Sequence, residues 1–199
     1  MKSIKRKKSA FSLIELLVVV AIVGIMAAAG SVALSSGSKS LSGATSTAST
    51  VFGLARTEAI MRRVPARVIV DTEYDPAKPD NYLRRMAVVV RNDTNTGWEQ
   101  VSRWTPLPGQ AFYNQDASRK HDSEAISGLL GGAGTGPYEY FEFSPSGQAK
   151  ERAQFVLSKG IVQGGTFQEI DSDSRAGFYL HKMGKPTFFK DPAEIPDPW

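Results

Sequence analysis

The 199-residue sequence contains no cysteine and only two histidines, and these absences narrow the possible chemistry. Without cysteine no disulfide can form, even in an oxidising compartment. His121 and His181 lie 60 residues apart, and neither has a neighbour at the spacing of a zinc site. We therefore expect surface or strand-packing roles for both histidines, and we predict no metal and no cofactor.

Other motifs that carry chemistry are incomplete. Asp171-Ser-Asp173 opens like a calcium loop, but Arg175 and Ala176 stand where such a loop needs an acid or amide and then glycine. The glycine-rich run 128–136 lacks the Gly-Lys-Ser/Thr of a phosphate-binding loop. A Ser-x-x-Lys string at Ser36 has no partner motifs. The sequence therefore gives no indication of an enzyme.

The N-terminus holds one long apolar run, Phe11–Leu34, with a single charge at Glu15 and no proline. About 20 apolar residues suffice to cross a bilayer as a helix, so this run predicts a transmembrane helix over 11–34. It is longer than the apolar part of a secretory signal, and no A-x-A-like cleavage site follows it. The small residue Ala10 precedes the run, so a cut there would remove residues 1–10 and keep the helix.

The basic excess of the chain is concentrated in that leader. Five of the 24 lysines and arginines lie within residues 1–10; the other 19 face 20 acidic residues, so the chain without its leader carries about −1 instead of +4. Lysine and arginine are retained on the cytoplasmic side of a membrane. The excess therefore predicts a single-pass membrane protein with its N-terminus in the cytoplasm and its C-terminal domain outside.

The stretch KSA-FSLIELLVVVAIVGI resembles the class III signal of type IV prepilins and type II secretion pseudopilins. The resemblance implies that a prepilin peptidase cuts between Ala10 and Phe11 and that the new N-terminal Phe11 is N-methylated. The family usually has glycine before the cut, so Ala10 is a departure. The resemblance also implies that Glu15, in an otherwise apolar helix, meets the N-terminal ammonium of a neighbouring subunit. Headgroup solvation of Glu15 is the alternative.

The same resemblance implies the partners: the peptidase, other pilins or pseudopilins in a helical filament, the inner-membrane assembly platform and the lipid bilayer. It also implies a location in the inner (cytoplasmic) membrane, with the C-terminal domain periplasmic or extracytoplasmic. Many major pilins close a C-terminal loop with a disulfide, which this chain cannot form. That difference favours a minor pilin or pseudopilin.

Residues 35–63 are predicted to connect the membrane helix to the domain that follows. The run 35–50 is rich in serine, threonine and glycine, which are poor helix formers. Apolar residues nevertheless recur every three or four positions, the spacing of one helical face; they are Leu41, Ala44, Ala48, Val51, Ala55 and Ala59. We expect an extended helix that softens across the serine-rich run; a flexible linker is the alternative.

The segment Val51–Val70 carries a second resemblance, to minor pseudopilins of the GspH/FimT type. Pro65 is expected to stop the helix, because proline disfavours the α region in the residue before it. Arg62 and Arg63 are interpreted as a solvated helix end, since cations are favourable at a helix C-terminus. Alternation over Arg67–Asp71 then predicts the first strand.

The remaining sequence, 64–199, indicates an antiparallel β domain. Turn signals separate the predicted strands, which are Leu83–Arg91, Trp98–Thr105, Tyr138–Phe143, Ala153–Ser158, and the hairpin Phe178–Met183 with Lys185–Phe189. The long glycine-rich segment 106–136 is interpreted as an irregular loop, and the proline-containing tail 191–199 as extended. The fragment FEFSPSGQA resembles the same minor pseudopilin family.

The predicted fold is therefore α+β and pilin-like: a long N-terminal transmembrane helix packed on an antiparallel β-sheet or sandwich domain. The predicted function is a minor pilin or pseudopilin, a structural subunit of a type II secretion pseudopilus or a type IV pilus. Two alternatives stay open. One is a pilus-tip module that binds DNA through Arg62, Arg63, Arg84 and Arg85, although the balanced charge makes nucleic acid an unfavoured partner. The other is a membrane-anchored domain that is not assembled into filaments.

Overall fold

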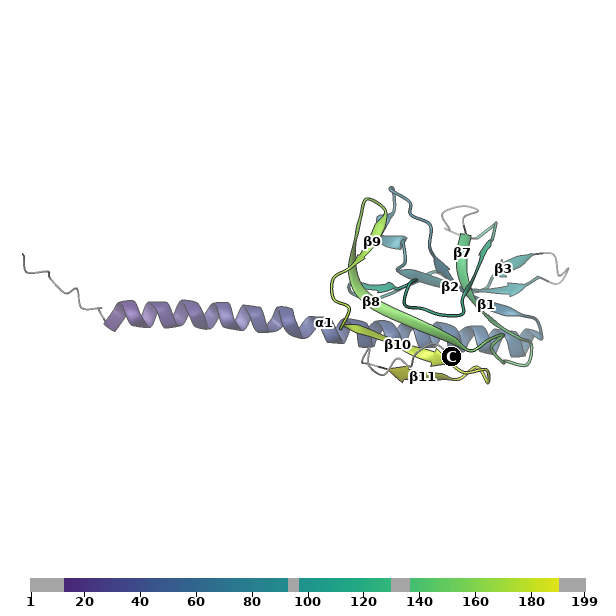
Figure 1. Cartoon of the computed structure of the whole chain (residues 1–199), viewed down its shortest axis with the longest axis horizontal. Coiled ribbons are helices and arrows are strands. Elements are labelled where there is room, and N and C mark those ends of the chain that lie inside the picture. Colours follow the sequence, from purple (N-terminus) through teal and green to yellow (C-terminus); the bar gives the residue numbers. More distant parts are fainter. Residues whose placement is uncertain (1–12, 93–96, 130–136, 190–199) are drawn as a thin grey trace, which may run out of the picture. The chain divides into compact units, whose positions relative to one another are not determined.

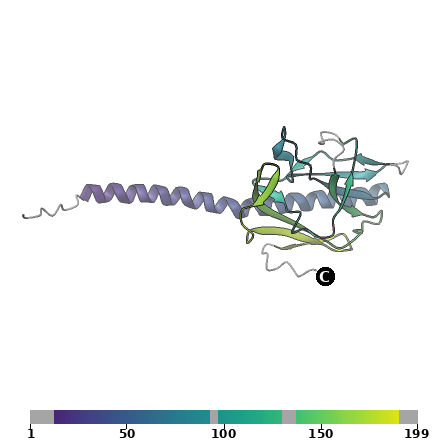
Figure 2. The same ribbon diagram turned by 45° about the horizontal axis from the view of Figure 1, so that its top comes forward.

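The structure is a computed structural model that describes residues 13–92, 97–129 and 137–189; within 13–40 it describes six side chains. The chain divides into two compact units, Met1–Gly37 and Ser38–Trp199. Helix α1, Leu13–Arg62, contributes to both, and its assignment continues through the serine- and glycine-rich run. The strands of the described residues all lie in the second unit (Figures 1 and 2).

The C-terminal part of α1 packs into the β domain by the face that the sequence predicts. The six residues at helical spacing are all buried, with at most 5% of each exposed; they are Leu41, Ala44, Ala48, Val51, Ala55 and Ala59. Four are alanines, which allow the helix to approach the strands closely. The helix ends at Arg62, and Arg63 adopts a left-handed conformation with φ of 56° ahead of Val64 and Pro65. The predicted helix end is therefore confirmed.

Two antiparallel sheets make up the β domain. Sheet A has the order β3-β2-β1-β7-β6, with β4 also paired to β2; its strands are β1 (Ala66–Asp71), β2 (Arg85–Arg91), β3 (Trp98–Gln100), β4 (Thr105–Pro106), β6 (Asp122–Ala125) and β7 (Pro137–Phe143). Sheet B has the order β11-β10-β8-β5, with β9 paired to β8; its strands are β5 (Ala111–Tyr113), β8 (Ala153–Gln163), β9 (Thr166–Glu169), β10 (Arg175–Leu180) and β11 (Pro186–Phe189). A short 3₁₀ helix, η1 (Pro79–Asn81), precedes β2.

The main core lies where α1 meets both sheets. The ring of Phe52, 2% exposed, packs against Phe141 of β7 and against Phe155 of β8, with ring centroids 5.2 Å apart in each case. Phe178 of β10 lies 4.9 Å away in an edge-to-face arrangement. In Figure 1 the teal strands of sheet A and the yellow hairpin β10–β11 flank this part of the helix. One side chain of α1 therefore joins the helix to both sheets.

A second apolar cluster covers the other face of sheet A, so β1 is buried along its whole length. Trp98 and Trp104 pack on this cluster, as predicted for these two anchors. Arg67 lies on the same face, between the rings of Trp98 and Tyr140, at 3.9 and 3.6 Å from their centroids. The alternating pattern of β1 therefore does not mark a solvent-exposed face, because its charged residues are covered by rings and ion partners.

Sequence reasoning was wrong about the segment 106–136, which contains β5 and β6 instead of one irregular loop. β5 is three residues long and β6 is a polar, exposed edge strand, so neither has an apolar alternation to reveal it. The predicted strand Trp98–Thr105 is two short strands, β3 and β4, and β9 was missed. The hairpin around Gly184 is confirmed as β10 and β11. The tail 191–199 and residues 93–96 of the predicted turn lie outside the described residues.

Gly177 of β10 is a position where sheet B has no room for a side chain. A Cβ there would overlap the carbonyl oxygen of Phe155 on the neighbouring strand and would lie 2.8 Å from Cζ of Phe189. We expect Gly177→Ala to lower the free energy of unfolding of residues 38–199 by about 1–3 kcal/mol, the usual cost of overpacking. Urea denaturation measures this change.

Gly53→Ala is the matched control, because nothing lies within 4 Å of a Cβ at Gly53 on α1. Alanine in an exposed helix is favoured over glycine by roughly 0.5–1 kcal/mol, so this variant should be slightly more stable. Equal stability of the two variants would contradict the packing assigned to Gly177.

Candidate functional site

The predicted processing site lies at the start of the chain. Ala10 and Phe11 are outside the described residues, and Glu15 lies in α1, where the structure describes its backbone but not its side chain. Their roles in cleavage, methylation and assembly therefore stay predictions.

The described side chains around Glu15 are apolar and strongly exposed. They are 51–70% exposed and comprise Ile14, Leu17, Val18, Val19, Val20 and Ile22. A contiguous exposed apolar surface in a protein marks a contact with another protein or with lipid. Within the part of the chain that the structure describes, no helix is both long and apolar enough to span a membrane.

The outward face of α1 is uncharged between Ser42 and Met61, one residue before the exposed Arg62 that ends the helix. Within the fully described stretch Ser42–Met61, none of the nine exposed residues carries a charge; they are Ser42, Gly43, Ser46, Thr50, Gly53, Leu54, Thr57, Ile60 and Met61. The exposed face of a helix in a soluble protein is normally rich in charged and polar residues. We call these nine residues the uncharged α1 face.

Threonine hydroxyls on and beside this face are satisfied by the helix itself. Thr50 and Thr57 donate hydrogen bonds to the carbonyl oxygens four residues earlier, at 3.0 and 2.9 Å, and Thr47 does the same at 3.0 Å. Their hydrogen-bonding capacity is thereby partly used inside the helix. A helix surface with small residues and internally bonded hydroxyls allows a second helix to approach closely. Sequence reasoning identified the buried face of α1 but missed this one, whose signal is the lack of lysine and glutamate.

Arg62 and Arg63 lie at the C-terminal end of α1, as predicted. Nε of Arg62 is 2.8 Å from Oε2 of Glu58 one turn earlier, and the Arg62 side chain is exposed. Arg63 is exposed as well. These two residues therefore form a solvated helix end.

Arg84 and Arg85 lie elsewhere, and the side chains of both bind other residues of the same domain. Arg85 is 9% exposed, 2.6 Å from the buried carboxylate of Asp71, and stacks over Trp104. Arg84 donates to the carbonyl oxygen of Gly109 and lies 3.5 Å from Asp80. The helix end lies near the other end of β2, because the amide of Arg91 donates a hydrogen bond to the carbonyl oxygen of Pro65. Arg91 is about 20 Å along the strand from Arg85. The structure therefore does not bring the four predicted arginines together.

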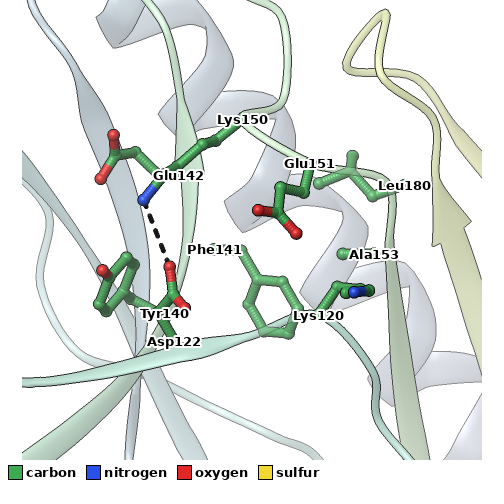
Figure 3. A pocket seen from close by; sticks show the side chains of 9 residues that line it. All are labelled: Lys120, Asp122, Tyr140, Phe141, Glu142, Lys150, Glu151, Ala153 and Leu180. Carbon is green, nitrogen blue, oxygen red and sulfur yellow. Dashed lines mark hydrogen bonds and ion pairs between the residues drawn. The ribbon is translucent and has the colours of Figure 1, made fainter.

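A small cavity opens beside β7, between β6 and β10 (Figure 3). Its floor includes the ring of Phe141, and five charged residues surround it, among them Lys150 and Asp122, whose charged atoms are 3.3 Å apart. The cavity measures about 20 Å³, room for one water-sized molecule. This volume does not accommodate an organic substrate.

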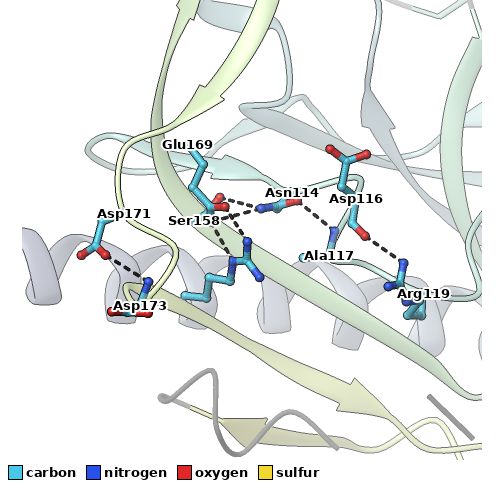
Figure 4. A network of polar contacts seen from close by, with 9 residues as sticks. Asn114, Asp116, Ala117, Arg119, Ser158, Glu169, Asp171 and Asp173 are labelled. Carbon is cyan, nitrogen blue, oxygen red and sulfur yellow. Dashed lines mark hydrogen bonds and ion pairs between the residues drawn. The ribbon is translucent and has the colours of Figure 1, made fainter. Parts of the chain in front are cut away.

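The acidic residues near β9 form a structural network (Figure 4). Both carboxylate oxygens of Glu169 accept from Arg175, at 2.8 and 2.5 Å, and Oε1 also accepts from Asn114 at 3.3 Å. Asp171, the first residue of the calcium-like string, instead accepts from the backbone of Asp173 and the hydroxyl of Ser174. These hydrogen bonds lower the pKa of the exposed Asp171 carboxyl. Among the described residues, no group of three side chains is arranged to hold a metal ion.

The two histidines take structural positions. His121 lies with Nδ1 3.1 Å from Oε2 of the buried Glu139, which also accepts from Gln115 at 2.6 Å. Burial, and secondarily the nearby Glu139 carboxylate, raise the pKa of Tyr113 well above its usual value. His181 is exposed and bonds Thr187 across the β10–β11 hairpin at 2.8 Å. Both agree with the predicted surface and strand-packing roles.

Solved structures of three chains resemble this protein at low sequence identity. Two are of the minor pseudopilin EpsH from the type II secretion system of Vibrio cholerae. One matches at 11% identity with a TM-score of 0.43, covering 73% of this chain and 93% of that chain. The other matches at 18% identity with a TM-score of 0.40, covering 76% of this chain and 96% of that chain. The third is the type IV minor pilin FimU of Pseudomonas aeruginosa, at 11% identity and TM-score 0.45, covering 77% of this chain and 90% of that chain. A search of curated proteins found no match.

The N-terminal segment gives the informative match. Residues 5–31 match the family model described as the prokaryotic N-terminal methylation motif. This range contains Ala10, Phe11 and Glu15, the residues on which the sequence resemblance depends. The α+β architecture, a long N-terminal helix with antiparallel sheets, agrees with the predicted pilin-like fold. Residues 5–31 therefore carry a prokaryotic N-terminal methylation motif, which agrees with the resemblance to prepilins seen in the sequence.

Proposed function

We propose that the protein is a minor pilin or pseudopilin of the GspH/FimT type, built into a type IV pilus or a type II secretion pseudopilus. Its N-terminal helix would anchor it in the inner membrane with the leader in the cytoplasm and the β domain outside. Prepilin peptidase would cut between Ala10 and Phe11 and leave an N-methylated Phe11, and the assembly platform would move the subunit into the filament. The matched motif, the basic leader and the lack of cysteine support this proposal.

The uncharged α1 face is the observation that carries the proposal. An isolated domain has no need for nine exposed helical positions without a charge. Nor does it need Gly53, which costs roughly 1 kcal/mol against alanine although nothing lies within 4 Å of a Cβ added there. A neighbouring helix in a filament would explain both the lack of charge and the glycine, because small residues permit close packing between helices. We therefore assign this face to helix–helix contacts between subunits.

The exposed apolar residues around Glu15 fit the proposed passage of the subunit from the membrane into the filament. In the membrane they contact lipid, and in the filament they contact the N-terminal helices of other subunits. A carboxylate in an apolar helix costs roughly 2.5–3.5 kcal/mol at the membrane centre on insertion scales. An ammonium at the methylated Phe11 of a neighbour would compensate this cost, since N-methylation leaves the amine protonatable. Glu15 would thereby select the position of the incoming subunit.

Intact mass and N-terminal sequencing test the proposal. The full chain is extracted from membranes of cells with and without prepilin peptidase. With the peptidase we expect a chain that starts at N-methyl-Phe11, and without it a chain that keeps residues 1–10. A chain that keeps its leader in the presence of the peptidase would contradict the proposal and favour a membrane-anchored domain outside any filament.

A further inference from the structure

The end of the β domain at the C-terminus of α1 carries an exposed apolar centre with a basic rim. The centre is Ile60, Met61 and Met183, which are 46%, 68% and 63% exposed. The rim is Arg63, Lys182 and Lys185, all exposed. We call these six residues the basic-apolar patch, and we propose that it docks an acidic surface of the next subunit of the filament.

Close backbone packing holds the parts of the patch together. Cδ1 of Ile60 would lie 2.5 Å from a Cβ on Gly147, so the last turns of α1 press on the β7–β8 turn. Gly184 in turn packs against the carbonyl oxygen of Gly147 and would place a Cβ 2.9 Å from Nε of Arg56. Nε of Arg56 donates to that same carbonyl oxygen at 2.9 Å. The helix end and the two turns therefore form one continuous surface.

The β10–β11 turn is fixed in this arrangement by its own bonds. The amide of Gly184 donates to the carbonyl oxygen of His181 at 2.7 Å, and Ala149 donates to that of Lys182 at 3.0 Å. Lys182, Met183 and Lys185 are consequently presented outward beside the helix end. Methionine adapts its shape to different partners, which suits a docking surface.

Charge argues for an acidic partner. The three segments that form this surface, 58–63, 144–149 and 181–185, hold four lysines and arginines and one acid, Glu58, which pairs with Arg62. The rest of 11–199 holds 15 basic and 19 acidic residues. These three segments therefore carry a net charge of +3, whereas the rest of 11–199 carries −4. Complementary charge steers encounter and fixes the orientation of a partner.

A protein surface fits the patch better than nucleic acid does. Phosphate backbones are bound by cations and polar groups, whereas this patch has three apolar side chains at its centre and one of its nearby arginines already paired. Apolar centres with charged rims are the usual construction of protein interfaces. The inference rests on the proposed function, since it names the chemistry of a neighbour in the same filament.

The absence of native cysteine makes a single-cysteine cross-linking test specific. Met183→Cys is introduced into the full chain, labelled with a benzophenone maleimide in assembling cells, and illuminated. Gln163→Cys is the matched control: it is exposed at the far end of β8, about 30 Å along that strand from Ala153. Sheared filaments are analysed by immunoblot for the chain and by mass spectrometry for the cross-linked partner.

We expect Met183→Cys, but not Gln163→Cys, to cross-link to an acidic subunit that itself carries an N-terminal methylation motif. Lys182→Glu with Lys185→Glu should lower the yield roughly tenfold through like-charge repulsion, and the two lysine-to-arginine changes should preserve it. Equal yields from both cysteines, no product at Met183→Cys, or a product removed by nuclease would overturn the inference while the chain remains in filaments. A chain absent from the sheared filaments would instead overturn the proposed function as well.

Discussion

Phe52→Ala should lower the free energy of unfolding of residues 38–199 by about 3–5 kcal/mol, the range for truncating a large buried aromatic side chain. Phe52 contacts aromatic rings from β7, β8 and β10, so its removal leaves a cavity bordered by both sheets. The rings around it are themselves packed together, with Phe155 and Phe178 stacked at 5.2 Å, which limits how far the cavity can collapse. Urea denaturation followed by circular dichroism measures the change.

Leu54→Ala is the control for this prediction, because Leu54 lies two positions away on the same helix but is 39% exposed. We expect a loss below about 1 kcal/mol for this variant, as for most exposed positions. Similar losses for the two variants would mean that α1 does not pack on the sheets through Phe52.

Glu15→Val should leave membrane insertion of the full chain intact and reduce its incorporation into filaments by roughly a hundredfold. Valine removes a charge from an apolar helix, so insertion becomes easier, but the ammonium of Phe11 on the neighbouring subunit loses its proposed partner. An uncompensated charge in that environment costs roughly 2.5–3.5 kcal/mol, which corresponds to about a hundredfold in an equilibrium. The measurement compares the amount of the chain in membranes and in sheared filaments.

Glu15→Asp keeps the carboxylate and serves as the control. We expect its incorporation into filaments to lie between that of the unsubstituted chain and that of Glu15→Val. Normal incorporation of Glu15→Val would rule out the proposed pairing. Loss of the valine variant from the membrane fraction would show that Glu15 acts during insertion instead.

The sequence allowed prediction of those parts of the fold that repeat a clear spacing. Leu41, Ala44 and the other buried positions of α1 follow a helical period, and Pro65 marks the helix end; both predictions agree with the structure. The aromatic alternation of β7 and the glycine between β10 and β11 were equally informative. β5 and β6 lacked such signals because they are short and one is polar, and their pairing depends on strands distant in sequence.

Burial of charged residues was the other feature that sequence reasoning did not foresee. Arg67 belongs to an alternating strand whose polar positions would usually face solvent, and Arg85 precedes an apolar run, yet ion partners and tryptophan rings cover both side chains. Their partners lie on other strands or beyond a turn, so no local pattern indicates the burial. For the site, the leader and Phe-Ser-Leu-Ile-Glu indicated the class of protein that we propose, whereas the uncharged α1 face and the basic-apolar patch could be found only in the structure.

The uncharged α1 face has a consequence for attempts to engineer the isolated domain. Standard stabilising designs replace exposed serine, threonine and glycine in helices by alanine, glutamate and lysine, and Gly53 and Thr57 would be among the first positions selected. Such changes would raise the melting temperature and solubility of the fragment. They would also place bulk and charge where a neighbouring helix is expected to lie. The most stable soluble versions of this domain should therefore be the ones least able to polymerise.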